Sequence, residues 1–303
     1  MNKLSSNDRA KILQLLCEGM SIRAVCRVTG ASKNTVVKLL TDAGAALGAY
    51  QDEAFRELTC KRVQVDEIWS FVYAKAKNVK TATAAPEGAG DAWTWTAIDA
   101  DTKLVFSIMV GGRNADIAYD FLSDVRTRIE GRFQITSDGH RSYMVASHAA
   151  FGSDEVDFAQ LVKIYGAPEG ARTPEARYSP SPCIGTEIKV RLGNPDAAHI
   201  STSYVERQNL TMRMHLRRFT RLTNGFSKKM ENHIRALALH FFYYNFVRIH
   251  STLRVTPAMA AGVTNRLWDM SDLVAVVEAA EKKPGKRGPY RKRHGEAAAH
   301  AVD

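Results

Sequence analysis

The fold is read most directly from one stretch, Ser201-Thr-Ser-Tyr-Val-Glu206-Arg-Gln-Asn209-Leu-Thr-Met-Arg213-Met-His-Leu-Arg217-Arg218-Phe219. Ser203 is a candidate N-cap with Glu206 at the third helical position, the pattern of a capping box. Apolar residues follow at helical spacing along one side, at Val205, Met212, Leu216 and Phe219. A second side carries a carboxylate and then polar and basic residues, Glu206, Asn209, Arg213 and Arg217. Such a helix could hold a metal ion and a phosphate backbone, although a surface helix whose only acid is a cap has the same pattern.

Two segments that read as strands also carry acids. The first is Arg62-Val-Gln-Val-Asp66-Glu67-Ile-Trp-Ser-Phe-Val72, rich in β-branched and aromatic residues, and the second is Phe133-Gln-Ile-Thr-Ser-Asp138-Gly139. An acid in a buried strand is costly unless it has a partner or a metal. Asp66, Asp138 and Glu206 together could hold two divalent ions for phosphoryl transfer. Strand alternation places Glu67 on the opposite face of the sheet, so it is not included.

Composition restricts the class of protein. A chain of 303 residues is long enough for two or more domains, and its net charge of +10 favours a polyanionic partner. The four cysteines have no close-paired spacing, which argues against a zinc site and for reduced thiols in a reducing compartment. The N-terminus lacks the apolar run of a signal peptide, and the most apolar stretch, 236–247, is too short and too polar for a membrane span. A cytoplasmic protein without a membrane partner is expected.

Residues 1–48 have the pattern of a helix-turn-helix domain. Apolar residues mark a first helix that ends near Gly19, Ser21 can cap a second, and a turn at Gly30 leads to a third helix capped by Ser32. In this interpretation the start of the third helix faces DNA, through Ser32, Lys33, Asn34, Thr35 and Lys38. The alternative is a small helical bundle of another kind. Residues 49–61 read as a linker or a short helix.

The order of the remaining elements predicts a mixed α/β fold. Strands are expected at 62–72, 93–98 and 104–110 as an antiparallel meander, then a helix at 114–128 with an apolar core stripe, and a strand at 133–136. Two strands are expected around an irregular loop within 151–203. A long helix at 227–249, with Ile234 in its core stripe, and a short helix at 271–281 follow. Asn209 is expected to contact DNA, and the side chains expected to neutralise its backbone are Arg213, Arg217, Arg218, Lys228 and Lys229. Five more expected contacts lie in a basic tail at 282–303: Lys286, Arg287, Arg291, Lys292 and Arg293. This tail is expected to be disordered without nucleic acid.

With these residues in place, the chain resembles a bacterial insertion-sequence transposase of the DDE type, close to the insertion-sequence-one family. The likeness lies in residues 65–72, 135–143 and 205–227, with Arg213 seven residues after Glu206, and in a closing segment at 244–257. Two features depart from the family. A cysteine-poor helix-turn-helix stands where some relatives bind zinc, and the 151–203 region is longer than expected.

The resemblance implies an RNase H-like mixed sheet flanked by helices at 62–260, with an insertion at about 151–203 and a helical C-terminal part at 261–281. It implies Asp66, Asp138 and Glu206 as both catalytic residues and metal ligands, with two Mg²⁺ ions for which Mn²⁺ can substitute. The implied activity is cleavage of DNA at transposon ends and strand transfer into target DNA.

The implied partners are double-stranded DNA, as terminal inverted repeats and target, and further copies of the chain in at least a dimer. The implied place is the bacterial cytoplasm, in association with the nucleoid. Two alternatives stay open. One is a non-catalytic, domesticated DNA-binding regulator, and the other is an RNase H-like nuclease that cuts without joining.

Overall fold

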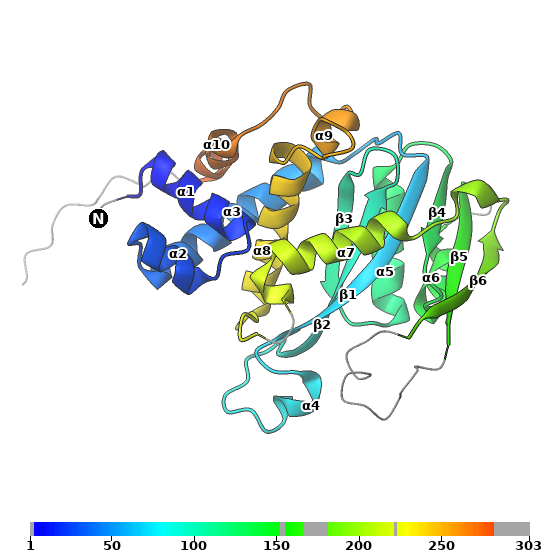
Figure 1. Cartoon of the computed structure of the whole chain (residues 1–303), viewed down its shortest axis with the longest axis horizontal. Helices are drawn as coiled ribbons and strands as arrows, with labels where there is room; N and C mark the ends of the chain where they lie inside the picture. The colour runs from blue at the N-terminus through cyan, green and yellow to red at the C-terminus, as the bar shows by residue number, and fades with distance from the viewer. Residues whose placement is uncertain (1–2, 152–154, 167–180, 221–222, 282–303) are drawn as a thin grey trace, which may run out of the picture.

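A six-stranded mixed sheet forms the centre of the molecule in the computed structural model, which describes residues 3–151, 155–166, 181–220 and 223–281 (Figure 1). The strand order is β3-β2-β1-β4-β5-β6. Their bounds are β1 Arg62–Val72, β2 Gly90–Asp99, β3 Val105–Gly111, β4 Phe133–Ser137, β5 Val156–Tyr165 and β6 Cys183–Leu192. The first three strands are the predicted antiparallel meander, whereas β4 runs parallel to β1, β5 parallel to β4, and β6 antiparallel to β5. The predicted mixed α/β class is therefore confirmed.

Helices cover both faces of this sheet. Helix α7, Ser203–His215, crosses one face over β1 and β2, while α5, Ala115–Arg128, and α6, Arg141–Ala150, pack together on the other (Figure 1). Helix α5 begins where Asn114 Oδ1 accepts a hydrogen bond from the backbone N–H of Ile117. Its predicted apolar stripe is buried, and Phe121 packs at 5.9 Å from the Trp95 ring of β2.

The N-terminal helices are α1, Ser6–Cys17, α2, Ile22–Thr29, and α3, Lys33–Ala54. Each starts at a serine whose hydroxyl accepts a backbone N–H, at Ser5, Ser21 and Ser32. Gly30 ends α2 with φ +74°, a conformation that glycine adopts without strain. Helix α3 continues to Ala54, so it passes through residue 48 and takes up the first part of the predicted linker.

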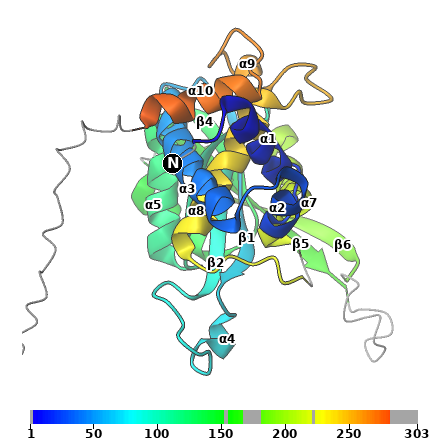
Figure 2. The same ribbon diagram turned by 90° about the vertical axis from the view of Figure 1, so that its left-hand side faces the viewer.

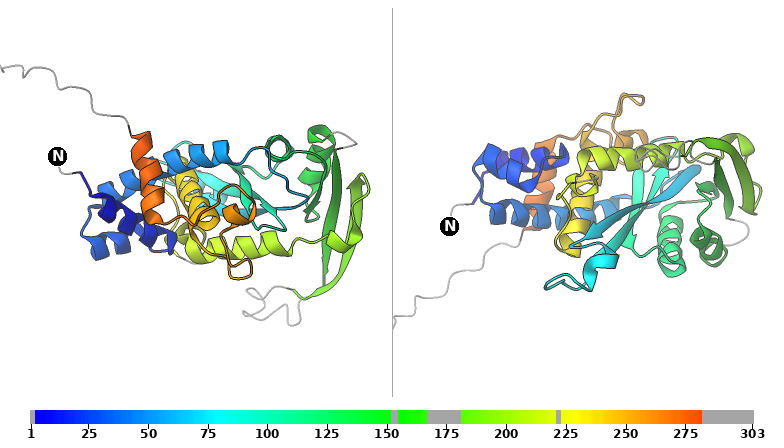
Figure 3. Two further views of the ribbon diagram at one scale, coloured as in Figure 1. Left: turned by 90° about the horizontal axis from the view of Figure 1, so that it is seen from above. Right: turned by 60° about the horizontal axis from the view of Figure 1, so that its bottom comes forward.

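Helices from the end of the chain complete this helical part. Helix α8, Met230–Phe242, continues into a π-helical turn, η4, Tyr243–Val247, and packs across α3, while α10, Met270–Ala280, packs on α1 and α3 (Figure 2). Arg9 of α1 is buried and pairs with Glu281 at 2.5 Å. The short helices α4, Ala76–Val79, and α9, Pro257–Ala260, complete the set of α-helices in the described ranges. The helical part and β6 lie at opposite ends of the molecule (Figure 3).

The long helix differs from the prediction in its start and in its buried side. It begins at Met230 rather than near residue 227, and Ile234, expected in the core, is 42% exposed. His233 and His240 are buried instead. The physical reason is that α8 is covered on more than one side, because it packs on α3 while His233 contacts Ser70 of β1 at 3.3 Å. A single apolar stripe does not describe such a helix.

The 151–203 region extends the sheet. Strands β5 and β6 form the two predicted strands, and the middle of the loop between them, 167–180, lies outside the described residues, as does the tail 282–303. Among the helices that the structure describes, none has the length and apolar character needed to cross a membrane.

Candidate functional site

Asp66 and Asp138 are brought together by the pairing of β1 with β4. The two strands run parallel with Gln64 opposite Thr136, so the residue that follows β4, Asp138, lies beside the middle of β1. Carboxylate oxygens of Asp66, Glu67 and Asp138 all lie within 4.8 Å of one another. The structure thus places two of the three predicted acids in one group.

Glu67 is the acid that strand alternation excluded, and its exclusion is corrected here. Its side chain does point to the face covered by α5 and α6, where Nε and Nη2 of Arg113 contact Oε1 at 2.7 and 2.6 Å. However, β4 ends at Ser137 while β1 continues to Val72, so the Asp138 carboxylate is close to acids from both faces. The side chain of Glu67 is fully buried, and the hydroxyl of the buried Tyr143 on α6 interacts with its carboxylate.

Burial and mutual repulsion make this group costly to ionise. Burial, followed by repulsion from Glu67 and Asp138, raises the pKa of Asp66 to about 7. Burial and then repulsion from Asp138 raise the pKa of Glu67 to about 7, although Arg113 acts in the opposite direction. Three close carboxylates are a donor set that suits a hard divalent cation such as Mg²⁺ or Mn²⁺.

Glu206 lies close to this group but outside it. Its carboxylate is held by Nζ of Lys163 on β5, which donates to both oxygens at 2.5 and 2.6 Å, and by the Thr202 hydroxyl at 2.6 Å. Its repulsion nevertheless contributes to the raised pKa of Asp66. The N-cap of α7 is Thr202 rather than Ser203, and its side chain makes no capping hydrogen bond. The predicted capping box is therefore wrong. Lys163 was not predicted, because a single lysine in a strand gives no signal of its partner.

Asn209 belongs to the carboxylate group rather than to an exposed DNA-binding face. It is buried one turn after Glu206, and its Nδ2 donates to Asp66 Oδ2 at 2.7 Å. Arg213 lies one turn further along α7. The helix ends at His215, so Arg217 is not on the same helical face as predicted but in the following 3-10 turn, η3, Arg217–Phe219.

Within the described residues, the other predicted DNA contacts come from the start of α3 and from the connection between α7 and α8. At the start of α3, Ser32, Lys33, Asn34 and Lys38 are exposed and Thr35 is half-buried; Ser32 caps the helix and Lys38 pairs with Asp42. Between α7 and α8, Arg217, Lys228 and Lys229 are exposed and Arg218 is partly buried. The five predicted contacts of the tail, Lys286, Arg287, Arg291, Lys292 and Arg293, lie outside the described residues.

Comparisons with known proteins give a limited result. No protein-family model and no curated protein matches the chain. Among solved structures, it is similar to a piggyBac transposase synaptic complex with hairpin DNA, with a TM-score of 0.40 and 9% identity over 91% of this chain and 72% of that one. It is also similar to a Mos1 mariner paired-end complex with Mn, with a TM-score of 0.19 and 13% identity over 52% of this chain and 60% of that one.

A Mos1 strand transfer complex is similar with a TM-score of 0.22 and 12% identity, over 79% of this chain and 78% of that one. The named neighbours are thus transposases, but likenesses of this size define neither a family nor an activity for this chain. The resemblance to the insertion-sequence-one family remains a prediction.

Proposed function

We propose that this protein is a DDE-type transposase that cleaves DNA at transposon ends and joins the freed ends to target DNA. The observation that supports it best is the convergence of Asp66 and Asp138, with their carboxylate oxygens within 4.8 Å, at the point where β4 ends beside β1. Glu206 approaches from α7 and completes the proposed catalytic and metal-binding triad. The neighbouring carboxylate of Glu67 adds a fourth acid to the same place.

The chain's own residues would bind and orient. Asp66 and Asp138 would hold Mg²⁺ or Mn²⁺, two ions in all, with Glu206 on one side, and Asn209 fixes the Asp66 carboxylate through its 2.7 Å hydrogen bond. When bound, such ions activate a water molecule and stabilise charge on phosphoryl and leaving oxygens. Lys163 neutralises Glu206 in the absence of a cation, since its ammonium group contacts both oxygens.

Two phosphoryl transfers at one site would account for the proposed activity. In the first, water attacks a phosphodiester at the transposon end, and the P–O bond to the 3′ oxygen breaks to release a 3′-hydroxyl. In the second, that hydroxyl attacks a phosphodiester of the target, so one P–O bond forms as another breaks. The proposal includes an RNase H-like core, a helix-turn-helix at 1–48 that binds terminal repeats, at least a dimer on DNA, and a bacterial, nucleoid-associated location.

The test compares wild type with Asp138→Asn on a supercoiled plasmid that carries the element's ends, with Mn²⁺ present. We expect cleavage and joining by wild type and a loss of more than ~100-fold in Asp138→Asn, because even groups that only support a metal ligand are worth 10–100-fold. Asp120→Asn, at an exposed acid of α5, is the matched control and should remain active. Binding without metal-dependent cleavage in either protein would refute the proposal in favour of a regulator, and cleavage without joining would refute it in favour of a nuclease.

A further inference from the structure

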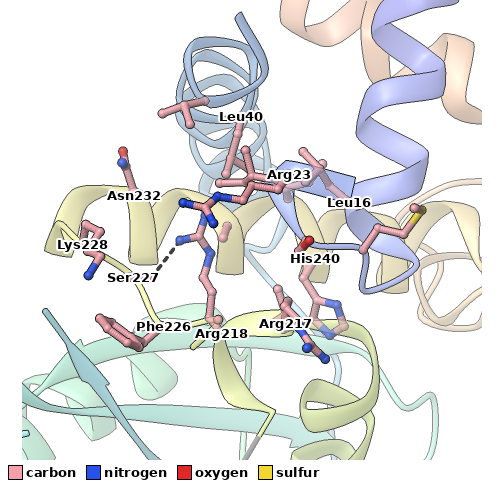
Figure 4. A pocket seen from close by; sticks show the side chains of 18 of the residues that line it. Leu16, Arg23, Leu40, Arg217, Arg218, Phe226, Ser227, Lys228, Asn232 and His240 are labelled. Carbon is pink, nitrogen blue, oxygen red and sulfur yellow. Dashed lines mark hydrogen bonds between the residues drawn. The ribbon is translucent and has the colours of Figure 1, made fainter. Parts of the chain in front are cut away.

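A cavity of about 790 Å³ lies where the N-terminal helices meet the connection between α7 and α8 (Figure 4). One wall comes from the α1–α2 turn and the start of α3, and the other comes from 216–218, 224–228 and the inner side of α8. It is separate from the carboxylate group, because neither Asp66 nor Asp138 lines it. Its size suits a small molecule or a short segment of a polymer rather than a double helix.

The charge of this cavity has one sign. Five cationic side chains line it, and no aspartate or glutamate does: Arg23, Lys33, Arg217, Arg218 and Lys228. None of the five forms an ion pair with a carboxylate within the described ranges. The N-terminus of α2 adds to this field, since Ser21, Ile22 and Arg23 line the cavity and the first turn of α2 contains no acid. Such a set of charges is matched by an anion.

Arg218 is the most buried of these cations. It reaches into the cavity from η3, and its Nη1 donates a hydrogen bond to the hydroxyl of Ser227, at 2.8 Å (Figure 4). Burial lowers its pKa to about 10, so it still carries its charge at neutral pH. A partly buried guanidinium whose partner is a neutral hydroxyl lacks the compensation that a carboxylate or phosphate would give.

A polar group without a hydrogen-bond partner among the described residues also lines the cavity. His240 of α8 is 2% exposed, and neither of its ring nitrogens has a hydrogen-bond partner within the described residues. Burial, with repulsion from His215 and Arg248, lowers its pKa to about 3, so the ring is neutral. Among the described residues, the cavity therefore contains a guanidinium without a carboxylate partner and an imidazole without a hydrogen-bond partner, which points to a ligand that hydrogen-bonds there.

The remaining surface of the cavity is suited to a sugar or a base. Leu16, Ile22, Leu40 and Leu239 supply apolar walls. Phe226 also lines the cavity; its ring packs against Phe71 at 4.8 Å and lies 4.2 Å from the Lys228 ammonium, which holds that charge beside the cavity. Phosphate alone would not use these groups.

We propose that this cavity binds the backbone phosphate and an unstacked nucleotide of a single DNA strand, with Arg218 and Arg23 on the phosphate. The inference rests on the proposed function for the choice of DNA as the polymer. It places a strand end, separated from its complement, between the N-terminal helices and α8. The cavity would thus give the strand a second contact with the protein, apart from the carboxylate group.

The test is fluorescence anisotropy of the full chain with a labelled single-stranded oligonucleotide in EDTA, so catalysis does not contribute. Arg218→Met keeps the length of the side chain and removes the buried charge. We expect ~10–100-fold weaker binding, the usual worth of a charge-assisted hydrogen bond, and a smaller dependence on salt. Arg23→Met, a second variant that leaves Arg218 in place, should also weaken binding. The matched control is Arg56→Met, at an exposed arginine outside both the cavity and residues 1–48, which should bind like wild type.

Several outcomes would overturn the inference. Equal binding by wild type and a folded Arg218→Met, or an equal loss for blunt duplex and single strand, would exclude a single-strand site. If pyrophosphate binds in an Arg218-dependent way while the oligonucleotide does not, the ligand is a free polyphosphate. Asp138→Asn should bind the oligonucleotide like wild type. If wild type fails to cleave the plasmid but its oligonucleotide binding still depends on Arg218, only the proposed transposase activity is refuted.

Discussion

Asp66→Asn should remove a pH-dependent penalty from the folded protein. An aspartate in an unfolded chain loses its proton near pH 3.8, whereas burial and the neighbouring acids raise the pKa of Asp66 to about 7. Between these values the folded state binds more protons than the unfolded state, so the stability of the metal-free wild type falls as pH rises. The stability that the protonated Asp66 contributes is fully present below pH 3.8 and is lost once pH passes about 7. Asparagine does not titrate, so the variant lacks this slope.

The size of the effect follows from the two pKa values. A rise from 3.8 to about 7 corresponds to about 4 kcal/mol, because each tenfold step is worth ~1.4 kcal/mol. Between about pH 5 and about pH 8 we expect roughly 2 kcal/mol, since part of the penalty builds up at lower pH and Glu67 titrates in the same range. Urea denaturation in EDTA at both pH values measures this difference as the free energy of unfolding.

A divalent cation gives the second arm of the same experiment. Mg²⁺ should stabilise wild type at the higher pH and stabilise Asp66→Asn much less, because an ion that binds the folded state shifts the equilibrium by mass action. Asp120→Asn changes an exposed acid and should keep the wild-type slope. If wild type and Asp66→Asn lose stability in parallel as pH rises, the carboxylates do not repel one another as the geometry requires.

Three further changes test other contacts. Asn245→Ala should lower the free energy of unfolding by about 2–4 kcal/mol in urea, because its buried amide pairs both the N–H and the C=O of Val105, at 3.1 and 2.8 Å; a cost below ~0.5 kcal/mol would contradict this. Lys163→Gln should tighten Mn²⁺ binding several-fold in calorimetry without DNA, since Glu206 then lacks its competing cation, and unchanged affinity would show that Lys163 does not compete. Gly44→Ala should cost ~1–3 kcal/mol in thermal unfolding, because the new methyl group would lie 2.6 Å from a Cα atom of α8, and a wild-type melting temperature would refute that close approach.

Much of the sheet could be predicted from the sequence, because its strands have strong local signals. β-branched and aromatic residues mark β1, and a short apolar run that ends at Asp138-Gly139 marks the end of β4. An acid at the end of one strand and an acid in the middle of another lie together only when those strands are neighbours. The ordered blocks of sequence predicted this arrangement, and the β1–β4 pairing provides it.

The position of Glu67 could not be predicted in the same way. The two-residue period of a strand predicts which face of the sheet a side chain occupies, but it does not predict where the neighbouring strand stops. Here β4 ends early, so Asp138 lies near acids of both faces. The exposure of Ile234 has a related cause, because the pattern of a single helix does not show how many neighbours will cover it. The link between Lys163 and Glu206 joins positions 43 residues apart and leaves no local trace.

The packing of α1 and α3 against α8 and α10 has a consequence for how the protein is made. The N-terminal helices leave the ribosome long before Met230–Phe242 and Met270–Ala280 have been translated, so their inner side has no cover during most of synthesis. The ion pair between Arg9 and Glu281, near the far end of the described chain, forms only after Glu281 has been translated. We therefore expect a prematurely terminated product that contains only the first helices to be degraded rather than to accumulate.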